Sequence, residues 1–201
     1  MHLVVISTER KEEWKDHQHI HWVQSVDETK DHSGADAVID LEFALTPERI
    51  NALQQCSEVV IVNSNLYTLL EINAPFVRIN GWPGFLNGGI EACAEAEQRE
   101  KTEQVFTSLN TKVEWLPDQV GFVTPRIISM IINEAFFALA EGVSTKEEID
   151  IAMKLGTAYP YGPFEWAEKI GLENIYQLLQ KLGKDQPRYA PAQLLEDSLG
   201  K

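Results

Sequence analysis

The stretch that decides the fold runs from Asp118 to Ile175 and reads DQVGFVTPRIISMIINEAFFALAEGVSTKEEIDIAMKLGTAYPYGPFEWAEKIGLENI. Its apolar residues recur with helical spacing between glycine and proline breaks, and no strand pattern follows Leu116. The run from Ile127 to Leu139 is apolar almost all round, which predicts a central, buried helix. Further helices are expected over residues 164–170, 172–182 and 192–199. The second part of the chain is therefore predicted to be all-α.

One helix start in this stretch has a specific signal. Gly142 is expected to end the long helix, and Ser144 then stands three residues before Glu147, which is the spacing of a capping box. The next helix is predicted to begin there and to stop at Gly156.

The sequence before Asp118 has a different character. Short apolar runs alternate with helical patterns, as in an α/β domain whose mainly parallel sheet is covered on both faces. Thr46 and Pro47 form a helix start, and another polar helix is expected over 95–109, with the acids between Glu91 and Glu103 on a solvated helix face. We place the boundary near Pro117-Asp118, giving domains 1–117 and 118–201. The strand candidates are Leu3–Ser7, Ile20–Val26, Ala37–Leu41, Val59–Asn63, Phe76–Asn80 and Val113–Leu116.

Composition limits the classes of partner. The 201 residues carry a formal net charge of -14, which repels phosphate backbones and anionic lipid, so neither nucleic acid nor a membrane surface is an expected partner. No apolar stretch approaches the roughly 20 residues of a membrane span. The cysteines, Cys56 and Cys93, form no metal or redox motif. We expect a cytoplasmic protein.

The stretch from Asp118 to Ile175 resembles the C-terminal helical domain of the 3-hydroxyacyl-CoA dehydrogenase family. The family pattern contains D-x-P-G-F-x-x-N-R, N-E-A, E-G, a D-I-D segment, G-P-F and I-G-L in this order. The matching residues are Asp118, Gly121-Phe122, Arg126-Ile127, Asn133-Glu134-Ala135, Glu141-Gly142, Ile149-Asp150, Ala152-Met153, Gly156, Pro160, Gly162-Pro163-Phe164 and Ile170-Gly171-Leu172.

The first half resembles the family faintly. Asn63-Ser64-Asn65, Arg78-Ile79-Asn80-Gly81 and Gly89-Ile90-Glu91 are similar to its S-N-T-S, R-x-x-G and V-E segments. The resemblance implies an abbreviated Rossmann-like domain followed by the helical domain. It also implies a homodimer, because the helical domain serves dimerisation in the family.

The resemblance directs attention to the turn after the first strand, where the family binds NAD on glycines. Glycine is needed there because the backbone must approach the pyrophosphate closely. Here Leu3–Ser7 is followed by Thr8-Glu9-Arg10-Lys11-Glu12-Glu13, and no glycine precedes Gly34. We therefore expect no cofactor-binding residue and no cofactor.

The family's catalytic positions have changed as well. Counting from Gly81 puts Pro83 where the family has its catalytic histidine, and Pro125 stands in place of the active-site asparagine. Tyr67 corresponds to the serine of the S-N-T-S segment. Glu91 alone matches, so it is the one catalytic candidate, although its role in the family is to orient the missing histidine. Proline can neither donate nor accept a proton in such a reaction.

Other residues are candidates for binding a ligand. The loop from Gly81 to Gly89 is rich in glycine and aromatic residues and corresponds to the family's active-site loop. We expect a ligand cleft lined by Asn65, Trp82, Phe85 and Arg126.

Three histidines form a separate pattern. His17, His19 and His21 would share one face of a strand and could ligate zinc or nickel. A solvated edge strand explains the alternation with fewer demands, so no metal site is expected.

These observations favour a degenerate family member, a pseudoenzyme that is not NAD-dependent and binds an acyl-CoA or related small molecule as a homodimer. One alternative is an active oxidoreductase of fatty-acid metabolism with a divergent site, which would use NAD. The other alternative is a structural partner of a full-length paralogue.

Overall fold

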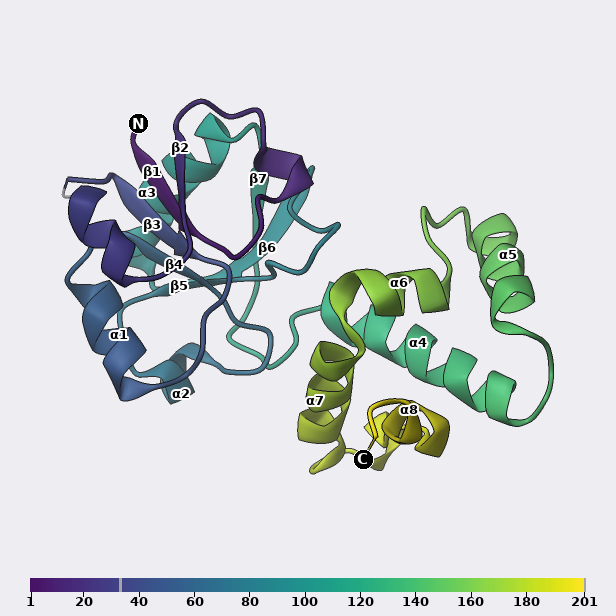
Figure 1. Cartoon of the computed structure of the whole chain (residues 1–201). Coiled ribbons are helices and arrows are strands. Elements are labelled where there is room, and N and C mark those ends of the chain that lie inside the picture. The colour runs from purple at the N-terminus through teal and green to yellow at the C-terminus, as the bar shows by residue number, and fades with distance from the viewer. Residues whose placement is uncertain (33, 201) are drawn as a thin grey trace. The chain divides into compact units, whose positions relative to one another are not determined.

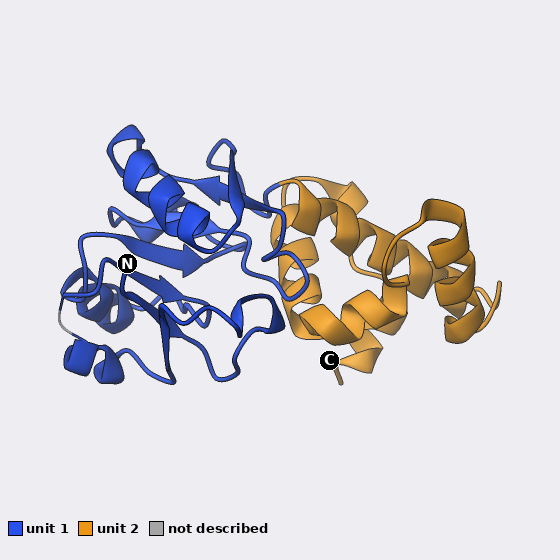
Figure 2. Cartoon of the chain, turned by 90° about the horizontal axis from the view of Figure 1, so that it is seen from above, with its two compact units in different colours: residues 1–122 blue, residues 123–201 orange. Residues whose placement is uncertain are grey.

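The computed structural model describes residues 1–32 and 34–200 (Figure 1). The chain divides into two compact units, Met1–Phe122 and Val123–Lys201, shown in blue and orange in Figure 2. The sequence boundary at Pro117-Asp118 lies slightly earlier than this division. The difference arises because Asp118 and Gln119 are hydrogen-bonded to Arg78 of the first unit.

The first unit contains a seven-stranded sheet with the order β2-β1-β3-β4-β5-β6-β7. The strands from β2 to β5 pair in parallel, β6 is antiparallel to β5, and β7 is parallel to β6. The predicted fold class, a mainly parallel sheet followed by helices, is confirmed. The strands are β1 (Leu3–Ile6), β2 (Ile20–Val23), β3 (Ala37–Asp40), β4 (Val60–Asn63), β5 (Val77–Ile79), β6 (Gly89–Cys93) and β7 (Lys112–Trp115).

Each face of this sheet is covered, which is why the central strands are nearly continuous apolar runs. One face packs with Leu53 of α1 (Pro47–Gln54) and Ile72 of α2 (Leu69–Ile72). The opposite face packs with Val105 and Phe106 of α3 (Ala96–Ser108). Successive side chains of β1 alternate between the two clusters, as the period of two requires.

The sequence patterns located most of these elements but missed β6. The acids from Glu91 to Glu103 were expected on a helix face, and this is wrong for Glu91, which lies within β6. Gly89 and Ala92 have low strand propensity, so this strand depends on its pairing with β5 and β7. The helix start at Thr46 is confirmed, because its hydroxyl accepts the Arg49 N–H at 3.2 Å.

The second unit is all-helical within its described residues. Helix α4 packs against α6, α7 and α8, and α5 packs against α6. The side-chain amide of Asn133, in the centre of α4, donates to Ala190 O at 2.9 Å and accepts the Ala192 N–H at 2.8 Å. The elements are α4 (Thr124–Ala140), α5 (Lys146–Thr157), α6 (Pro163–Ile170), α7 (Leu172–Gly183), η3 (Pro187–Tyr189) and α8 (Gln193–Ser198).

Two expectations about these helices need correction. The capping box of α5 uses Thr145 and Glu148, one residue later than predicted, while the Ser144 hydroxyl donates to the same Glu148 carboxylate. The helix also continues through Gly156 to Thr157, because an alanine in the left-handed conformation at 158 ends it.

The prediction that α4 is buried all round is also wrong in part. Ile127 and Phe137 are exposed on one side of this helix, whereas Ile132 is fully buried on the other. An apolar sequence can therefore belong to a helix that leaves one face uncovered.

None of the helices within residues 1–32 and 34–200 combines the length and the apolar character that crossing a membrane requires.

Candidate functional site

The sheet reverses its direction of growth between β1 and β3, because β2 lies on one side of β1 and β3 on the other. In open α/β sheets, ligands bind beyond the carboxyl ends of the strands at such a switch point. In this protein the carboxylate of Glu42 lies at that position. Glu42 Oε1 accepts hydrogen bonds from Ser7 Oγ at 3.2 Å, Thr8 N at 3.3 Å and Thr8 Oγ1 at 3.2 Å.

The turn that carries Glu42 is held by a buried ion pair. Asp40, the last residue of β3, accepts both Arg49 Nε and Arg49 Nη2 at 2.7 Å. The same carboxylate accepts the backbone N–H of Glu42 at 3.0 Å. Burial raises the pKa of Asp40, and the hydrogen bonds from Arg49 oppose that effect. Glu42 is thus fixed in place by α1 as well as by β3.

The connection from β1 to β2 also differs from a dinucleotide-binding unit. Residues 7–19, all of which the structure describes, contain only the three-residue 3-10 helix η1 (Glu12–Trp14). An α-helix at this position would direct its N-terminal N–H groups and its dipole at a phosphate. The sequence expectation that this turn has no cofactor-binding residue remains a prediction.

A series of hydrogen-bonded polar side chains, Asn65, Asn80 and Glu91, lies beyond the ends of β4 and β5 and within β6. Asn65 Nδ2 donates to Asn80 Oδ1 at 3.1 Å, and Asn80 Nδ2 donates to Glu91 Oε2 at 3.3 Å. Asn65 and Asn80 are buried, and Glu91 is half-buried. Asn65 Oδ1 is buried without a hydrogen-bond partner among the described residues. Two of the predicted site residues, Asn65 and Glu91, are therefore joined through Asn80, which the sequence analysis did not single out.

At the same ends of the strands, the backbone after β5 comes very close to β4. The Gly81 N–H donates to Asn63 Oδ1 at 2.9 Å, and Asn63 Nδ2 donates to Leu41 O at 3.1 Å. A Cβ atom at Gly81 would lie 2.8 Å from Asn63 Cβ, which is too close for any side chain. Glycine is needed at this position so that β4 and the loop after β5 can meet.

The glycine-rich loop contains the two aromatic candidates. Trp82 is buried, and its backbone N–H donates to Asn80 Oδ1 at 3.3 Å. Phe85 is half-buried, and its backbone N–H donates to Trp82 O at 3.1 Å. The Gly84 N–H donates to Glu13 Oε1 at 2.8 Å, which ties the loop to the segment after β1.

Arg78 connects this edge to the segment that leaves the sheet. Its fully buried guanidinium donates to Ser64 O and Gln119 O and forms an ion pair with Asp118. Burial lowers the pKa of Arg78, while the charge of Asp118 acts against that shift. The guanidinium carbon also lies 4.6 Å from the centre of the Phe122 ring. Asp118 and Phe122 of the motif are thus anchored within the first unit.

The remaining predicted positions are distributed over both units. Tyr67 and Pro83 lie half-buried in the first unit. Pro125, in the first turn of α4, is buried, and Arg126 next to it is half-buried. The expected cleft joining Arg126 to Asn65, Trp82 and Phe85 remains a prediction, because Arg126 belongs to the second unit.

The first unit also has a depression of about 500 Å³. Its lining includes Leu69, Phe76, Cys93, Gln98 and Asp118. None of the predicted site residues lines it, so this depression and the series of hydrogen-bonded polar side chains are separate features of the sheet domain.

Sequence reasoning missed several of the residues that organise this site. Asn80 and Arg78 stood within the quoted R-x-x-G segment, which was a usable signal. Glu42 had none, because Ser7 and Thr8, from which it accepts hydrogen bonds, are more than thirty residues away along the chain.

The comparisons with known proteins concentrate on the second unit. Residues 121–200 match the family described as 3-hydroxyacyl-CoA dehydrogenase, C-terminal domain. The 3-hydroxyadipyl-CoA dehydrogenase of Escherichia coli (strain K12) is 43% identical over 82 residues, which are 40% of this chain and 17% of that protein. The 3-hydroxybutyryl-CoA dehydrogenase of Bradyrhizobium diazoefficiens is 39% identical over 98 residues, which are 48% of this chain and 33% of that protein.

The fold comparison extends over both units. The crystal structure of (S)-3-hydroxybutyryl-CoA dehydrogenase from Ralstonia eutropha matches 90% of this chain and 70% of its own with a TM-score of 0.73. At 24% identity this match concerns the fold alone. The aligned stretches span a third or less of the two curated relatives. Residues 121–200 therefore form a domain of the family described as 3-hydroxyacyl-CoA dehydrogenase, C-terminal domain.

Proposed function

We propose that this protein is a degenerate 3-hydroxyacyl-CoA dehydrogenase relative that does not use NAD and binds an acyl-CoA-type molecule as a homodimer. The observation that carries the proposal is the position of Glu42, whose carboxylate accepts the Thr8 N–H and the hydroxyls of Ser7 and Thr8. A bound pyrophosphate would have to displace the Glu42 carboxylate from these donors. The two negative groups would then lie side by side, which Coulomb repulsion opposes.

The hydrogen-bonded residues Asn65, Asn80 and Glu91 also support a protein without dehydrogenase chemistry. Oxidation of a hydroxyl group requires a base that takes its proton as the hydride leaves. Glu91 accepts a hydrogen bond from the side chain of Asn80, and a carboxamide does not titrate near neutral pH. All five histidines lie between His2 and His32, before β3 begins. The pairing of Glu91 with an amide is suited to binding a polar group rather than to moving a proton.

The proposed ligand class rests on the family and on one unpaired atom. The relatives are named as dehydrogenases of 3-hydroxyadipyl-CoA and of 3-hydroxybutyryl-CoA. Asn65 Oδ1 is a buried acceptor that an N–H or O–H group of a ligand would satisfy. Asn65 is therefore the residue through which a ligand would be held at the ends of β4 and β5.

Two measurements test this proposal together. A fluorescence titration of NADH should give no saturable signal, and NADH mixed with acetoacetyl-CoA should keep its absorbance in the presence of the protein. The Ralstonia eutropha enzyme serves as the positive control. A steady, protein-dependent loss of NADH absorbance would overturn the proposal.

Ligand binding is tested separately by thermal shift. Acetoacetyl-CoA should raise the melting temperature of the wild type, since a ligand that binds only the folded state stabilises it. The Asn65→Leu variant should lose this response, whereas the Asn51→Leu variant, altered at an exposed position of α1, should keep it. Equal responses in both variants would contradict the role given to Asn65.

A divergent active enzyme is the second candidate. It is favoured by the hydrogen bond that keeps Glu91 next to Asn80 at the family's active-site segment. If the protein is such an enzyme, turnover of a 3-hydroxyacyl-CoA should fall by at least tenfold in Glu91→Gln while the fold is retained.

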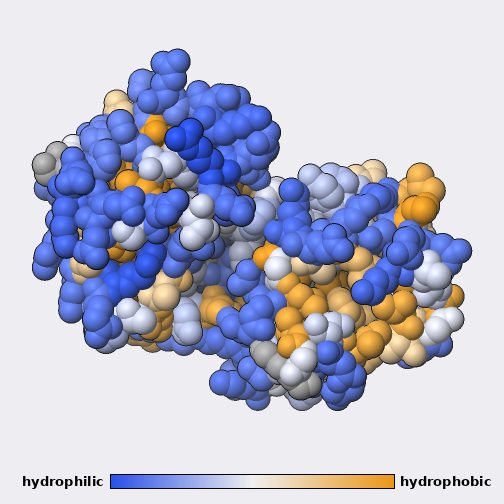
Figure 3. Space-filling view, viewed as in Figure 1, coloured by the Kyte–Doolittle hydropathy of each residue, from blue (hydrophilic) through white to orange (hydrophobic). Residues whose placement is uncertain are grey.

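The homodimer is supported by exposed apolar residues of the helical domain. Ile151 is 54% exposed and Leu155 is 82% exposed on α5, and Figure 3 shows apolar residues gathered on one face of this domain. Such a surface is typical of an interface with a second subunit.

Oligomeric state provides the test for the homodimer. Light scattering after size exclusion should give the mass of a dimer for the wild type and of a monomer for Leu155→Glu. The matched control is Leu70→Glu, which changes a leucine that is 86% exposed in the other unit and should leave the dimer intact. A monomeric wild type at micromolar concentration would remove this part of the proposal.

A further inference from the structure

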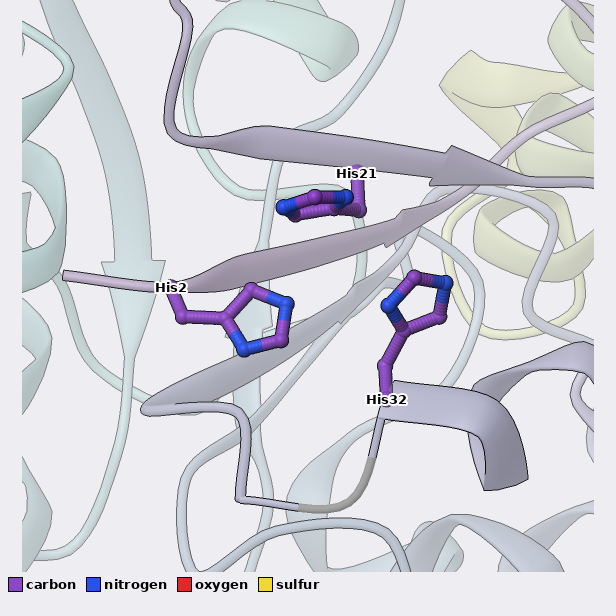
Figure 4. A group of neighbouring side chains, drawn as sticks. All are labelled: His2, His21 and His32. Carbon is purple, nitrogen blue, oxygen red and sulfur yellow. The ribbon is translucent and has the colours of Figure 1, made fainter.

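Three histidines from separate segments meet at one edge of the sheet (Figure 4). His2 precedes β1, His21 lies within β2, and His32 ends the 3-10 helix η2 (Asp27–His32). Their ring centroids are 4.6 Å apart for His2 and His21, 5.0 Å for His21 and His32, and 5.7 Å for His2 and His32. One potential ligand atom from each residue lies within 4.8 Å of the others.

The register of the first two strands explains the meeting of His2 with His21. Val4 pairs with His21 in the parallel ladder, so these two residues point to the same face of the sheet. His2 lies two residues before Val4 and therefore faces the same way. The cluster differs from the predicted alternation, because the strand begins at Ile20 and only one of the three alternating histidines lies on it.

The backbone around His2 is held on both sides. The His2 N–H donates to Asp36 Oδ2 at 2.6 Å, and the Asp36 N–H donates to His2 O at 2.8 Å. His32 is placed by the same segment, because its carbonyl accepts the Ala35 N–H at 3.2 Å. Two of the three imidazoles are thus positioned by backbone contacts that do not involve their rings.

The ring of His2 lacks a partner for one of its nitrogens. His2 Nε2 is buried and makes no hydrogen bond among the described residues. A buried ring nitrogen facing two other imidazoles calls for a shared partner that accepts lone pairs. Burial and the two neighbouring histidines lower the pKa of His2.

We propose that His2, His21 and His32 form a binding site for a divalent zinc-type cation, with one coordination position left for water or another ligand. Three imidazoles are the ligand set that suits zinc, copper and nickel, whereas magnesium and calcium require oxygen ligands. In a tetrahedral site with Zn–N bonds of about 2.0–2.1 Å, ligand nitrogens are about 3.4 Å apart. His21 is exposed, so its side chain has room to adjust toward the other two rings.

Tag-free protein allows this proposal to be tested without competing histidines. Zinc should be titrated against a chromophoric chelator, and cobalt should be used as a spectroscopic probe of coordination. We expect one zinc ion per chain with a dissociation constant of about 1 μM or lower at pH 7.5, and visible cobalt bands of a four- or five-coordinate site. The absence of saturable zinc binding would overturn the proposal.

Matched variants distinguish this site from weak binding by surface histidines. His21→Gln and His32→Gln should each weaken zinc binding at least tenfold and remove the cobalt bands. His17→Gln and His19→Gln alter the two histidines that precede β2 outside the cluster, and both should bind zinc as the wild type does. Circular dichroism checks that each variant is folded. Equal losses in the two sets would overturn the proposal, whatever the outcome with NADH and acyl-CoA.

Discussion

Arg78 and Asp118 form an ion pair whose guanidinium is completely buried beneath the segment that leaves the sheet domain. The Asp118 carboxylate also accepts the N–H groups of Leu69 at 3.0 Å and Leu70 at 3.3 Å, at the start of α2. One carboxylate thus satisfies a buried cation and two helix N–H groups. This arrangement gives Asp118 a structural role at the start of the segment that leaves the sheet.

Removal of the Arg78 guanidinium should lower the free energy of unfolding. Arg78→Met leaves Asp118 without its counter-charge and leaves Ser64 O and Gln119 O without their donor. We expect the free energy of unfolding to fall by about 3–5 kcal/mol, measured by urea denaturation. The control is Lys101→Met, which breaks an exposed ion pair with Glu58 and should leave the free energy of unfolding nearly unchanged. Similar losses in the two variants would contradict the role of Arg78.

The second prediction concerns Asn133 of the N-E-A segment. Asn133→Leu removes the amide that pairs with Ala190 O and the Ala192 N–H. The unpaired groups should lower the free energy of unfolding by about 1–3 kcal/mol and expose residues 190–198 to faster hydrogen exchange. Glu134→Ala changes the exposed neighbour and should have an effect of about 0.5 kcal/mol or less. Unchanged exchange in Asn133→Leu would argue against this anchoring role.

Local sequence patterns predicted the buried strands, whereas a strand that depends on long-range pairing was missed. The apolar runs of β1, β3 and β4 were predictable because burial on both faces leaves a continuous pattern in the sequence. Strand β6 was not, since Gly89 and Ala92 become extended only through pairing with neighbours. Local propensity is a weak guide where tertiary pairing determines the conformation.

In the candidate site too, short motifs identified single residues, whereas the contacts between them depend on the fold. Asn65 and Glu91 were identified because they match short motifs, but their connection through Asn80 depends on the pairing of β5 with β6. Glu42 had no signal, because its partners are more than thirty residues away. Likewise, His21 drew attention through the alternation with His17 and His19, while its true neighbours come from other segments.

The third prediction is a dependence of stability on acid pH. Hydrogen bonding by Ser144 lowers the pKa of Glu148, and hydrogen bonding by Lys154 lowers the pKa of Glu165, from an ordinary value of 4.5. A carboxyl group with a lower pKa in the folded state contributes stability above its unfolded pKa, and this contribution is lost as pH falls through the folded pKa. Asp150 acts in the opposite direction, because burial raises its pKa.

Urea denaturation between pH 3 and pH 7 measures this effect. The wild type should lose stability below about pH 4.5 more steeply than the Glu148→Gln, Glu165→Gln double variant. The two proteins should approach one another toward the acid end of this range, as pH falls through the lowered pKa of the two glutamates. Parallel pH profiles for wild type and variant would show that these caps do not contribute.

The fourth prediction concerns the glycine of the G-P-F segment. Asp150 accepts the backbone N–H groups of Phe164 at 2.8 Å and Glu165 at 3.2 Å, so a side chain of α5 caps α6. A Cβ atom at Gly162 would overlap the Asp150 side chain, so only glycine permits this contact. Gly162→Ala should therefore lower the free energy of unfolding by about 1–3 kcal/mol, because either the aspartate or the turn must move.

Gly156 provides the matched control, since it lies within α5 and a Cβ atom there would meet nothing within 4 Å. Gly156→Ala should raise the free energy of unfolding by about 0.4–1 kcal/mol, because alanine restricts the unfolded chain and favours the helix. Urea denaturation of the two variants should thus give changes of opposite sign. If Gly162→Ala were as stable as the wild type, the cap provided by Asp150 could not require glycine, and the motif would need another explanation.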